Sequence, residues 1–289
     1  MSDTLLEPWS IIGVESIQVT VRPGRTLALF HHPGETGNQT CVFLVHGAGG
    51  NRHQWRHQWQ LFVQAGYRVL AWDQLGHGDS AQPADPRAYA GDELLEDYQQ
   101  LIQEYGLARN ILIGHSYGAR LTLALLQKLE FEGRLGWISK AALVAPPALD
   151  FSLRSPLLYL PIWLLNRLQP QLEKGFRRAA WHPDTAAALI DHEESLARRN
   201  DLRIFRALAR QASRLDRERL ARLALPVLVL AGEQDGLTPA SGAWELAGEL
   251  PDAHFEVLAG AGHQLMLEQA EVVNRWLDEF LEGVSEKLR

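Results

Sequence analysis

The chain has very little cysteine, and it has no long uninterrupted run of apolar residues. Cys41 is the one cysteine among 289 residues, so an internal disulfide is excluded and a reducing compartment, the cytoplasm, is expected. The longest hydrophobic stretch, residues 155–166, is interrupted by Pro156 and Pro161 and is too short to span a bilayer. Residues 1–10 lack a basic segment followed by an apolar one, so no secretory signal is predicted.

Positive charge is also in deficit. Lys and Arg number 28 against 35 Asp and Glu, a formal net charge of −7, which argues against a nucleic-acid partner. The hydrophobic share of 46% and the charged share of 22% exclude a disordered chain and a membrane bundle. Metal-ligand spacing is missing around the scattered histidines His53, His57, His182 and His192, so no zinc site is expected.

What the chain does contain is an alternation of short apolar runs with helical patterns. This alternation predicts βαβ units and an α/β fold with a mostly parallel sheet flanked by helices. It lapses between residues 151 and 222, which we interpret as an inserted helical cap on a core formed by residues 1–150 and 223–289. The predicted strands are residues 16–21, 26–30, 41–45, 67–72, 110–113, 140–145, 227–231 and 254–258.

The stretch 111–121 reads as a strand, a sharp turn and a helix, with Ser116 between Gly114 and Gly118. A serine that projects from the end of a strand straight into a helix needs a strained, positive-φ backbone that crowds its neighbours. Glycine at both flanking positions removes the Cβ atoms that would collide. The pattern therefore predicts an exposed hydroxyl beside the unpaired N–H groups of a helix start.

This Gly-x-Ser-x-Gly turn resembles the nucleophile elbow of the α/β-hydrolase superfamily of serine hydrolases. The resemblance implies a catalytic triad in the chain order Ser116, Asp235, His263, with Asp150 as the alternative acid. It also implies an oxyanion hole formed by the backbone N–H groups of Ala48 and Tyr117.

Several other residues of the resembling motifs are expected to be structural. His46, in the loop His46-Gly47-Ala48-Gly49-Gly50, should hydrogen-bond to shape that loop, and His115 should pack and orient the elbow. Asp73 and His77 should stabilise the loop after the fourth strand.

The resemblance implies a cofactor-free carboxylesterase or lipase-like enzyme that cleaves an ester of an apolar small molecule or lipid through an acyl-enzyme on Ser116. Serine at this position argues against dehalogenases and epoxide hydrolases, which use aspartate. Thioesterase, lactonase, carbon–carbon bond hydrolase and perhydrolase activities stay open, as does a non-catalytic ligand-binding or scaffold protein. The oligomeric state is left open too. Candidate pocket walls in the cap are Trp163, Leu164, Leu165 and Phe176.

The predicted cap is basic, with 14 Lys or Arg against 8 Asp or Glu. Arginines follow one another at steps of three or four, which predicts one amphipathic helix with a basic outer stripe. Such a stripe is usually solvated or paired with an acidic body. The alternative is contact with an anionic substrate or, beside the apolar residues 157–165, with a membrane surface. The stripe comprises Arg199, Arg203, Arg206, Arg210, Arg214 and Arg217.

Overall fold

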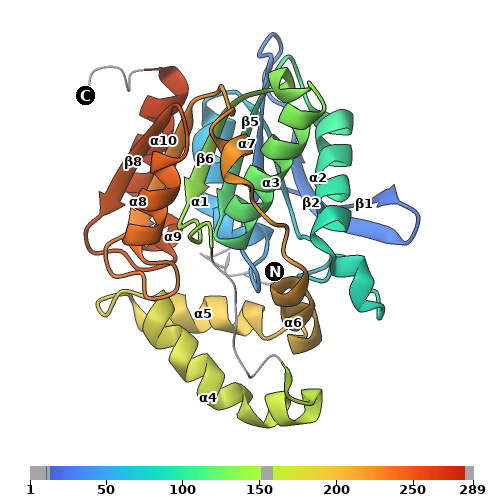
Figure 1. Ribbon diagram of the computed structural model, residues 1–289, viewed down its shortest axis with the longest axis vertical. Helices are drawn as coiled ribbons and strands as arrows, with labels where there is room; N and C mark the ends of the chain where they lie inside the picture. Colours follow the sequence, from blue (N-terminus) through green and yellow to red (C-terminus); the bar gives the residue numbers. More distant parts are fainter. Residues whose placement is uncertain (1–10, 12–13, 151–158, 284–289) are drawn as a thin grey trace, which may run out of the picture.

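An eight-stranded sheet forms the centre of the molecule (Figure 1). The computed structural model describes residues 11, 14–150 and 159–283, so the predictions for residues 1–10 and for 151–158 lie outside the described residues. The strands follow the spatial order β1-β2-β4-β3-β5-β6-β7-β8. They are β1 (Ile17–Arg22), β2 (Arg25–His32), β3 (Thr40–Val45), β4 (Arg68–Trp72), β5 (Arg109–His115), β6 (Ile138–Val144), β7 (Val227–Gly232) and β8 (Ala253–Leu258).

The sheet is parallel except at one edge, which confirms the predicted fold class. β1 and β2 form an antiparallel hairpin, and β2 runs antiparallel to β4. The remaining neighbours, from β4 through β3 to β8, pair in parallel. Every residue of β3 is buried, because helices cover both faces of the sheet and no position along a central strand meets water.

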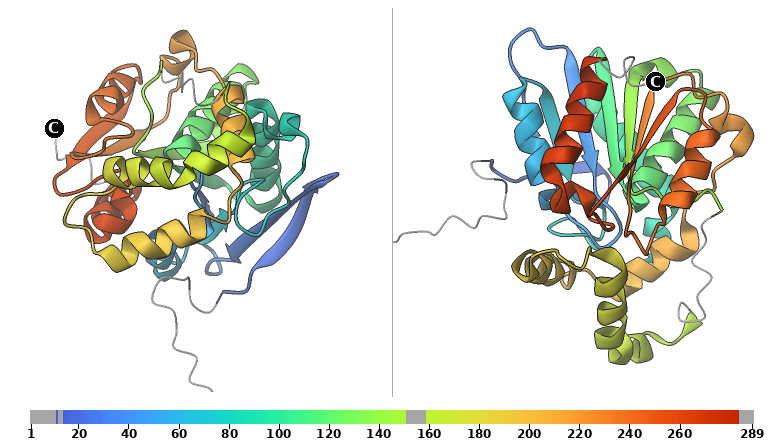
Figure 2. Two further views of the ribbon diagram at one scale, coloured as in Figure 1. Left: turned by 90° about the horizontal axis from the view of Figure 1, so that it is seen from below. Right: turned by 90° about the vertical axis from the view of Figure 1, so that its left-hand side faces the viewer.

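Helices of the core lie on both faces of the sheet (Figure 2). One face packs α2 (Gly91–Tyr105), α3 (Tyr117–Phe131) and α8 (Ala240–Gly248). The opposite face packs α1 (Arg56–Gln64), α9 (Leu265–Glu268) and α10 (Ala270–Glu282). Because strand side chains alternate, adjacent residues such as Phe43 and Leu44 enter opposite cores. Among the described residues, the short 3-10 helices η1 (Arg52–Trp55), η2 (Pro86–Tyr89) and η3 (Leu135–Trp137) lie in core connections.

Three helices cover the carboxyl ends of the parallel strands, at the bottom of Figure 1. They are α4 (Ile162–Ala180), α5 (Ala187–Ala197) and α6 (Leu202–Gln211). α5 is fastened to the core by an ion pair between Glu193 and Arg56, which join at 2.7 Å with both side chains at least 96% buried. Removal of either partner would leave an uncompensated buried charge, so this ion pair links α5 to the core.

The arginine stripe is not one helix, and that prediction is wrong. Asp201 caps the start of α6, which ends at Gln211, and a separate short helix, α7 (Arg217–Leu220), begins after Asp216. Tertiary hydrogen bonds hold the segment between them out of helical conformation. Gln127 on α3 bonds both backbone groups of Asp216, and Arg120 donates to the Ser213 carbonyl. These contacts outweigh the helical propensity of the segment.

Most of the stripe arginines have partners. Arg199 pairs with Asp79 of the core at 2.9 Å, and Arg217 pairs with Asp150 and Glu249. Arg203 pairs with the capping Asp201, and the Arg210 guanidinium lies 4.8 Å from the ring centre of Tyr159. Across the described ranges, no helix is both long and apolar enough to cross a membrane.

Candidate active site

The elbow joins β5 to α3 through a single residue. β5 ends at His115 and α3 begins at Tyr117, which leaves Ser116 at φ 52° and ψ −116°, a strained conformation for a residue with a Cβ. Its N–H donates to the Val144 carbonyl at 2.9 Å, so the neighbouring strand β6 holds it there. Ser116 is half-buried and stands at the first turn of α3, where the N–H of Tyr117 has no partner within the helix.

The two elbow glycines are required by close packing. A Cβ on Gly114 would lie 2.5 Å from the Gly118 carbonyl oxygen. A Cβ on Gly118 would lie 2.3 Å from the Val45 oxygen and 2.6 Å from that of His46. Backbone atoms cannot move out of the way without shifting β3 or α3. The tight turn therefore packs the first turn of α3, at Gly118, directly against the end of β3 and the loop that follows it.

Asp235 and His263 form a buried hydrogen-bonded pair. Asp235 follows β7 and His263 follows β8, and the imidazole Nδ1 lies 2.8 Å from the carboxylate Oδ2. The Asp235 carboxylate also accepts from the backbone N–H groups of Leu237 and Thr238, each at 2.8 Å, and from the Thr238 hydroxyl at 2.7 Å. Burial opposes ionisation, but these donors, His263 first among them, hold the pKa of Asp235 below its usual value.

This pairing fixes the tautomer of His263. An ionised carboxylate can only accept, so the imidazole proton lies on Nδ1 and Nε2 is left free to accept a proton. The alternative acid, Asp150, is not placed for this role. Its side chain is 88% exposed and pairs with Arg217 at 3.1 Å.

His115 connects the elbow to the histidine loop. Its ring lies 4.8 Å from that of His263, and its Nε2–H donates to the His263 carbonyl at 2.9 Å. Burial lowers the pKa of His115 to about 3, so the ring is neutral and its other nitrogen carries no proton. The residue before Ser116 thereby holds the loop that carries His263.

The loop after β3 is a tight turn fixed by hydrogen bonds. The Gly50 N–H donates to the Gly47 carbonyl at 3.0 Å, and Gly49 has a φ of 78°, which a residue without Cβ accepts at little cost. His46 donates from Nδ1 to the same Gly47 oxygen at 2.7 Å and accepts from the Gln74 N–H at Nε2. Because a trans peptide is planar, fixing the Gly47 oxygen directs the Ala48 N–H to the opposite side.

The turn after β4 supports this loop from beneath. Asp73 is fully buried and accepts from the N–H groups of Arg52 and Asp79 at 2.7 and 2.9 Å. His77 accepts the Gly49 N–H at Nε2, 3.0 Å away, and burial lowers the pKa of His77 to about 3. The structural roles expected for His46, Asp73 and His77 agree with these contacts.

Two residues that the sequence did not single out support the site. Thr238 bonds Asp235 and lies 3.1 Å from Nδ1 of His263, and its own hydroxyl can donate to the Ala145 carbonyl. Glu268 accepts from the Gly262 N–H, next to His263, and from the His182 N–H, two residues after the end of the cap helix α4. In the sequence, the one indication of the role of Thr238 is its position three residues after Asp235. Nothing in the local sequence around Glu268 points to its role.

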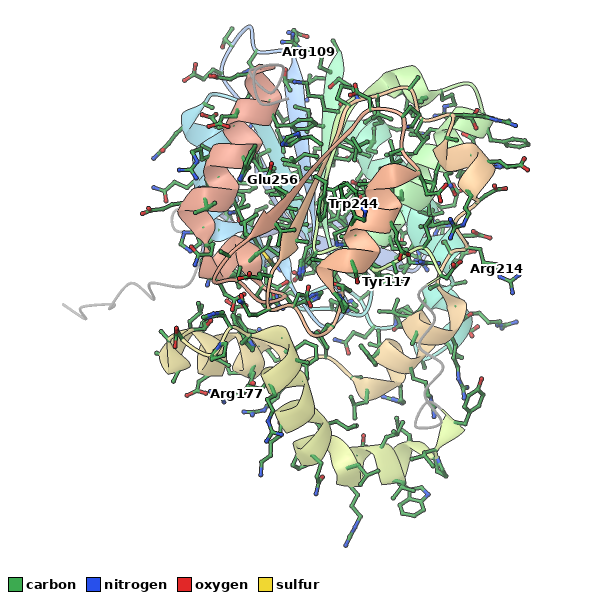
Figure 3. The ribbon with its side chains drawn as sticks, turned by 60° about the vertical axis from the view of Figure 1, so that its left-hand side comes forward. Arg109, Tyr117, Arg177, Arg214, Trp244 and Glu256 are labelled. Carbon is green, nitrogen blue, oxygen red and sulfur yellow. The ribbon has the colours of Figure 1, made fainter. Side chains whose placement is uncertain are left out.

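The last turn of α4 contacts both the loop that carries Asp235 and the loop that carries His263. The Gly236 N–H donates to the Ala179 carbonyl at 2.9 Å, and the His263 N–H donates to the Ala180 carbonyl at 2.8 Å. The cap therefore contacts the acid loop and the histidine loop through its backbone. Figure 3 shows α4 and α5 directly beneath these loops.

The four candidate pocket residues have different environments on α4. Leu165 is buried and Leu164 is half-buried, while Phe176 keeps 42% of its surface exposed on the same helix face as Leu165. Trp163 is 65% exposed, two residues and therefore about 200° around the helix from Leu165. Trp163 therefore lies on the opposite side of α4 from Leu165, and its assignment to a pocket wall stays a prediction. Within the described residues, no three His, Cys, Asp or Glu side chains gather as a metal site.

Comparison with known proteins identifies the family. The family described as serine aminopeptidase S33 matches residues 36–270 of the chain. The chain is a member of this family of α/β-hydrolases. It is 31% identical over 273 residues to the mouse protein ABHD8, a match that covers 90% of this chain and 61% of ABHD8. The chain thus spans about three fifths of that relative's length.

Two further proteins are similar to this chain over most of its length and over nearly their own whole length. RutD from Caulobacter vibrioides, whose proposed activity is carbamate hydrolysis, is 29% identical over 275 residues, 87% of this α/β-hydrolase and 94% of RutD. An esterase from Exiguobacterium antarcticum superposes with a TM-score of 0.80 at 20% identity, over 93% of this chain and 100% of the esterase. The structural likeness establishes the fold.

Proposed function

We propose that this α/β-hydrolase is a cofactor-free serine hydrolase that cleaves a carboxylic ester or a related acyl bond through an acyl-enzyme on Ser116. The observation that carries the proposal is the buried Asp235–His263 pair, which leaves a proton-accepting Nε2 on a loop held by His115, next to the elbow. Nucleophile, base and orienting acid are the groups that acyl transfer requires.

In this mechanism the Ser116 oxygen attacks the carbonyl carbon while Nε2 of His263 takes the hydroxyl proton. The Ala48 and Tyr117 N–H groups stabilise the negative oxygen of the tetrahedral intermediate. The intermediate collapses, and the leaving alcohol receives the proton from His263. In the second half, Nε2 of His263 takes a proton from a water molecule, which attacks the acyl carbon. His263 then returns the proton to the Ser116 oxygen as that oxygen leaves, which releases the acid and regenerates Ser116.

Apolar acyl or alcohol groups are the proposed substrate portions, because Leu165 and Phe176 present an apolar face of the cap helix α4. Hydrolysis of a carbamate, a thioester, a lactone or a carbon–carbon bond would use the same serine, histidine and aspartate, as would formation of a peracid. An N-terminal aminoacyl amide belongs to the same set, given the family's description. A panel that varies the acyl length and the leaving atom, from oxygen to sulfur and nitrogen, distinguishes these reactions.

Labelling with a fluorophosphonate tests the proposal directly. We expect covalent, stoichiometric modification of the wild-type protein at Ser116, and no modification of the folded Ser116→Ala variant. Absence of label on folded wild-type protein would reject catalysis and favour the competing function, a ligand-binding or scaffold protein that retained the fold.

We further propose that the outer face of α4 meets an anionic lipid surface. Trp163 is exposed there, and Arg167, Lys174 and Arg178 are exposed without an ion pair among the described residues. An exposed tryptophan among basic side chains suits the interface of a negatively charged bilayer. The test is co-sedimentation with phosphatidylserine and phosphatidylcholine vesicles. Binding should require phosphatidylserine and should weaken more in Arg167→Gln/Lys174→Gln than in the charge-matched core variant Arg87→Gln/Arg275→Gln.

A further inference from the structure

Asn200 is a cap residue that bonds two loops of the core. It lies between α5 and α6, and its Nδ2 donates to the Gly49 carbonyl at 2.7 Å. Its Oδ1 accepts from the Gly78 N–H at 3.1 Å. The first bond reaches the loop that carries Ala48, and the second reaches the turn that contains His77. Both hydrogen-bonding ends of one side chain are therefore used to join the cap to the floor of the site.

The bond to Gly49 is the first of a series that ends at Ala48. The Gly49 carbonyl and the Gly50 N–H belong to the same peptide unit, and that N–H donates to the Gly47 carbonyl at 3.0 Å. The Gly47 carbonyl and the Ala48 N–H again share one peptide unit. Each unit is planar and trans, so its donor points opposite to its acceptor. Two rigid units therefore connect the amide of Asn200 to the Ala48 N–H.

The loop has little stiffness of its own. Residues 47, 49 and 50 are glycines, so the peptide units around Ala48 can reorient at low steric cost. Hydrogen bonds from outside fix three successive peptide units instead. His46 holds the Gly47 oxygen, His77 holds the Gly49 N–H, and Asn200 holds the Gly49 oxygen. Of these three hydrogen bonds, the one from Asn200 is the one that comes from the cap.

We infer that Asn200 is a positioning residue for the oxyanion hole, so that the docked cap completes the catalytic apparatus as well as covering it. Asn200 orients the Ala48 N–H through the series of peptide units. It also polarises that donor, because hydrogen bonds in series strengthen one another. The inference rests on the proposed function, since the Ala48 N–H matters in this way only where a carbonyl oxygen becomes negative.

The test compares two variants of Asn200 with a neighbouring control. Asn200→Asp keeps the shape and the acceptor for Gly78, but it places a carboxylate oxygen against the Gly49 carbonyl. Asn200→Ala removes both bonds. The control is Arg199→Ala, which removes the adjacent link between cap and core through Asp79 and leaves the glycine loop untouched.

Hydrolysis of an activated ester should show a lower kcat with little change in KM. Deleting an oxyanion donor costs about 10²–10³ in kcat, so misdirecting one should cost about tenfold or more. Arg199→Ala should keep a kcat within about twofold of wild type in this assay. It removes an exposed ion pair between cap and core, which contributes little to stability, and it leaves the bonds to the glycine loop in place. Loss confined to KM, an unchanged kcat, or an equal loss in Arg199→Ala would each overturn the inference.

Amide hydrogen exchange gives a second readout that does not need activity. Exchange at Gly50 should be faster in both Asn200 variants than in wild type and Arg199→Ala, while the core strands stay protected. Unchanged exchange at Gly50 would overturn the positioning role even if one variant folds poorly and only the other can be measured. If the wild-type protein takes no fluorophosphonate label, the proposed function fails, and the exchange experiment still decides whether Asn200 orders the loop.

Discussion

Replacing Asp235 by asparagine should abolish activity while leaving the fold intact. Oδ1 of Asp235 accepts two backbone N–H groups at 2.8 Å, from Leu237 and Thr238, so the amide oxygen of asparagine must occupy that place. The amide NH₂ then takes the place of Oδ2, 2.8 Å from Nδ1 of His263. An NH₂ group only donates. The His263 proton therefore moves to Nε2, and the nitrogen that should take the Ser116 proton is blocked.

The opposite orientation of the amide is disfavoured by the same contacts. It would set the NH₂ against two backbone donors, which costs about 1–3 kcal/mol for each unsatisfied group. Thr238 is no obstacle to the first orientation, because its hydroxyl can donate to the Ala145 carbonyl at 3.1 Å. A wrong tautomer in a serine–histidine–aspartate site costs about 10⁴ in kcat, or about 5 kcal/mol of transition-state stabilisation.

Steady-state hydrolysis of a p-nitrophenyl ester measures this effect, with the melting temperature as a check on folding. Glu233→Gln makes the same change from carboxylate to amide two residues earlier in the loop, at an exposed position, and should keep full activity. A folded Asp235→Asn variant that retains more than about a tenth of wild-type kcat would refute the tautomer argument.

Three further predictions concern stability. Ser116→Gly should raise the free energy of unfolding by about 1 kcal/mol in urea titrations while removing all fluorophosphonate label, because glycine accepts the φ of 52° without strain. Gly118→Ala should lower that free energy by about 3 kcal/mol or more, since the new Cβ would lie 2.3 Å from the Val45 oxygen. Acid should destabilise the protein: the pKa values of His46 and His77, about 4 and 3 when folded, lie below the unfolded value of about 6.5. The unfolded chain then binds more protons below pH 6.5, and each histidine removes up to about 1.4 kcal/mol per pH unit down to its folded pKa. A urea midpoint equal at pH 5 and pH 7 would contradict this.

The sequence predicted the sheet and the elbow because both depend on local patterns. Short apolar runs such as residues 41–45 and 227–231 favour buried strands because of their length and their valines, and their alternation with helices indicates a parallel sheet. The positions of Gly114 and Gly118 follow from the crowding of one sharp turn. The resemblance to the α/β-hydrolases predicted Asp235 and His263 in the loops after β7 and β8, at the edge where the parallel strands end.

The cap shows where local patterns fail. The arginine spacing predicted one long helix, yet hydrogen bonds from Gln127 and Arg120, far away in the sequence, interrupt it. Trp163 and Leu165 are both apolar neighbours on α4, but only packing decides which of them turns toward solvent. In both cases the burial of side chains and the tertiary hydrogen bonds outweigh the local conformational propensity of the sequence.

By itself, therefore, the sequence determined the α/β fold and the elbow, since the first follows from hydrophobic patterning and the second from backbone sterics. The resemblance to the α/β-hydrolases added Asp235 and His263 as the expected partners of Ser116. Only the tertiary structure decided that Asp235 rather than Asp150 meets His263, and that Asn200 joins the cap to the Ala48 loop. Those choices depend on distances between segments that are remote in the chain, and no local pattern encodes such distances.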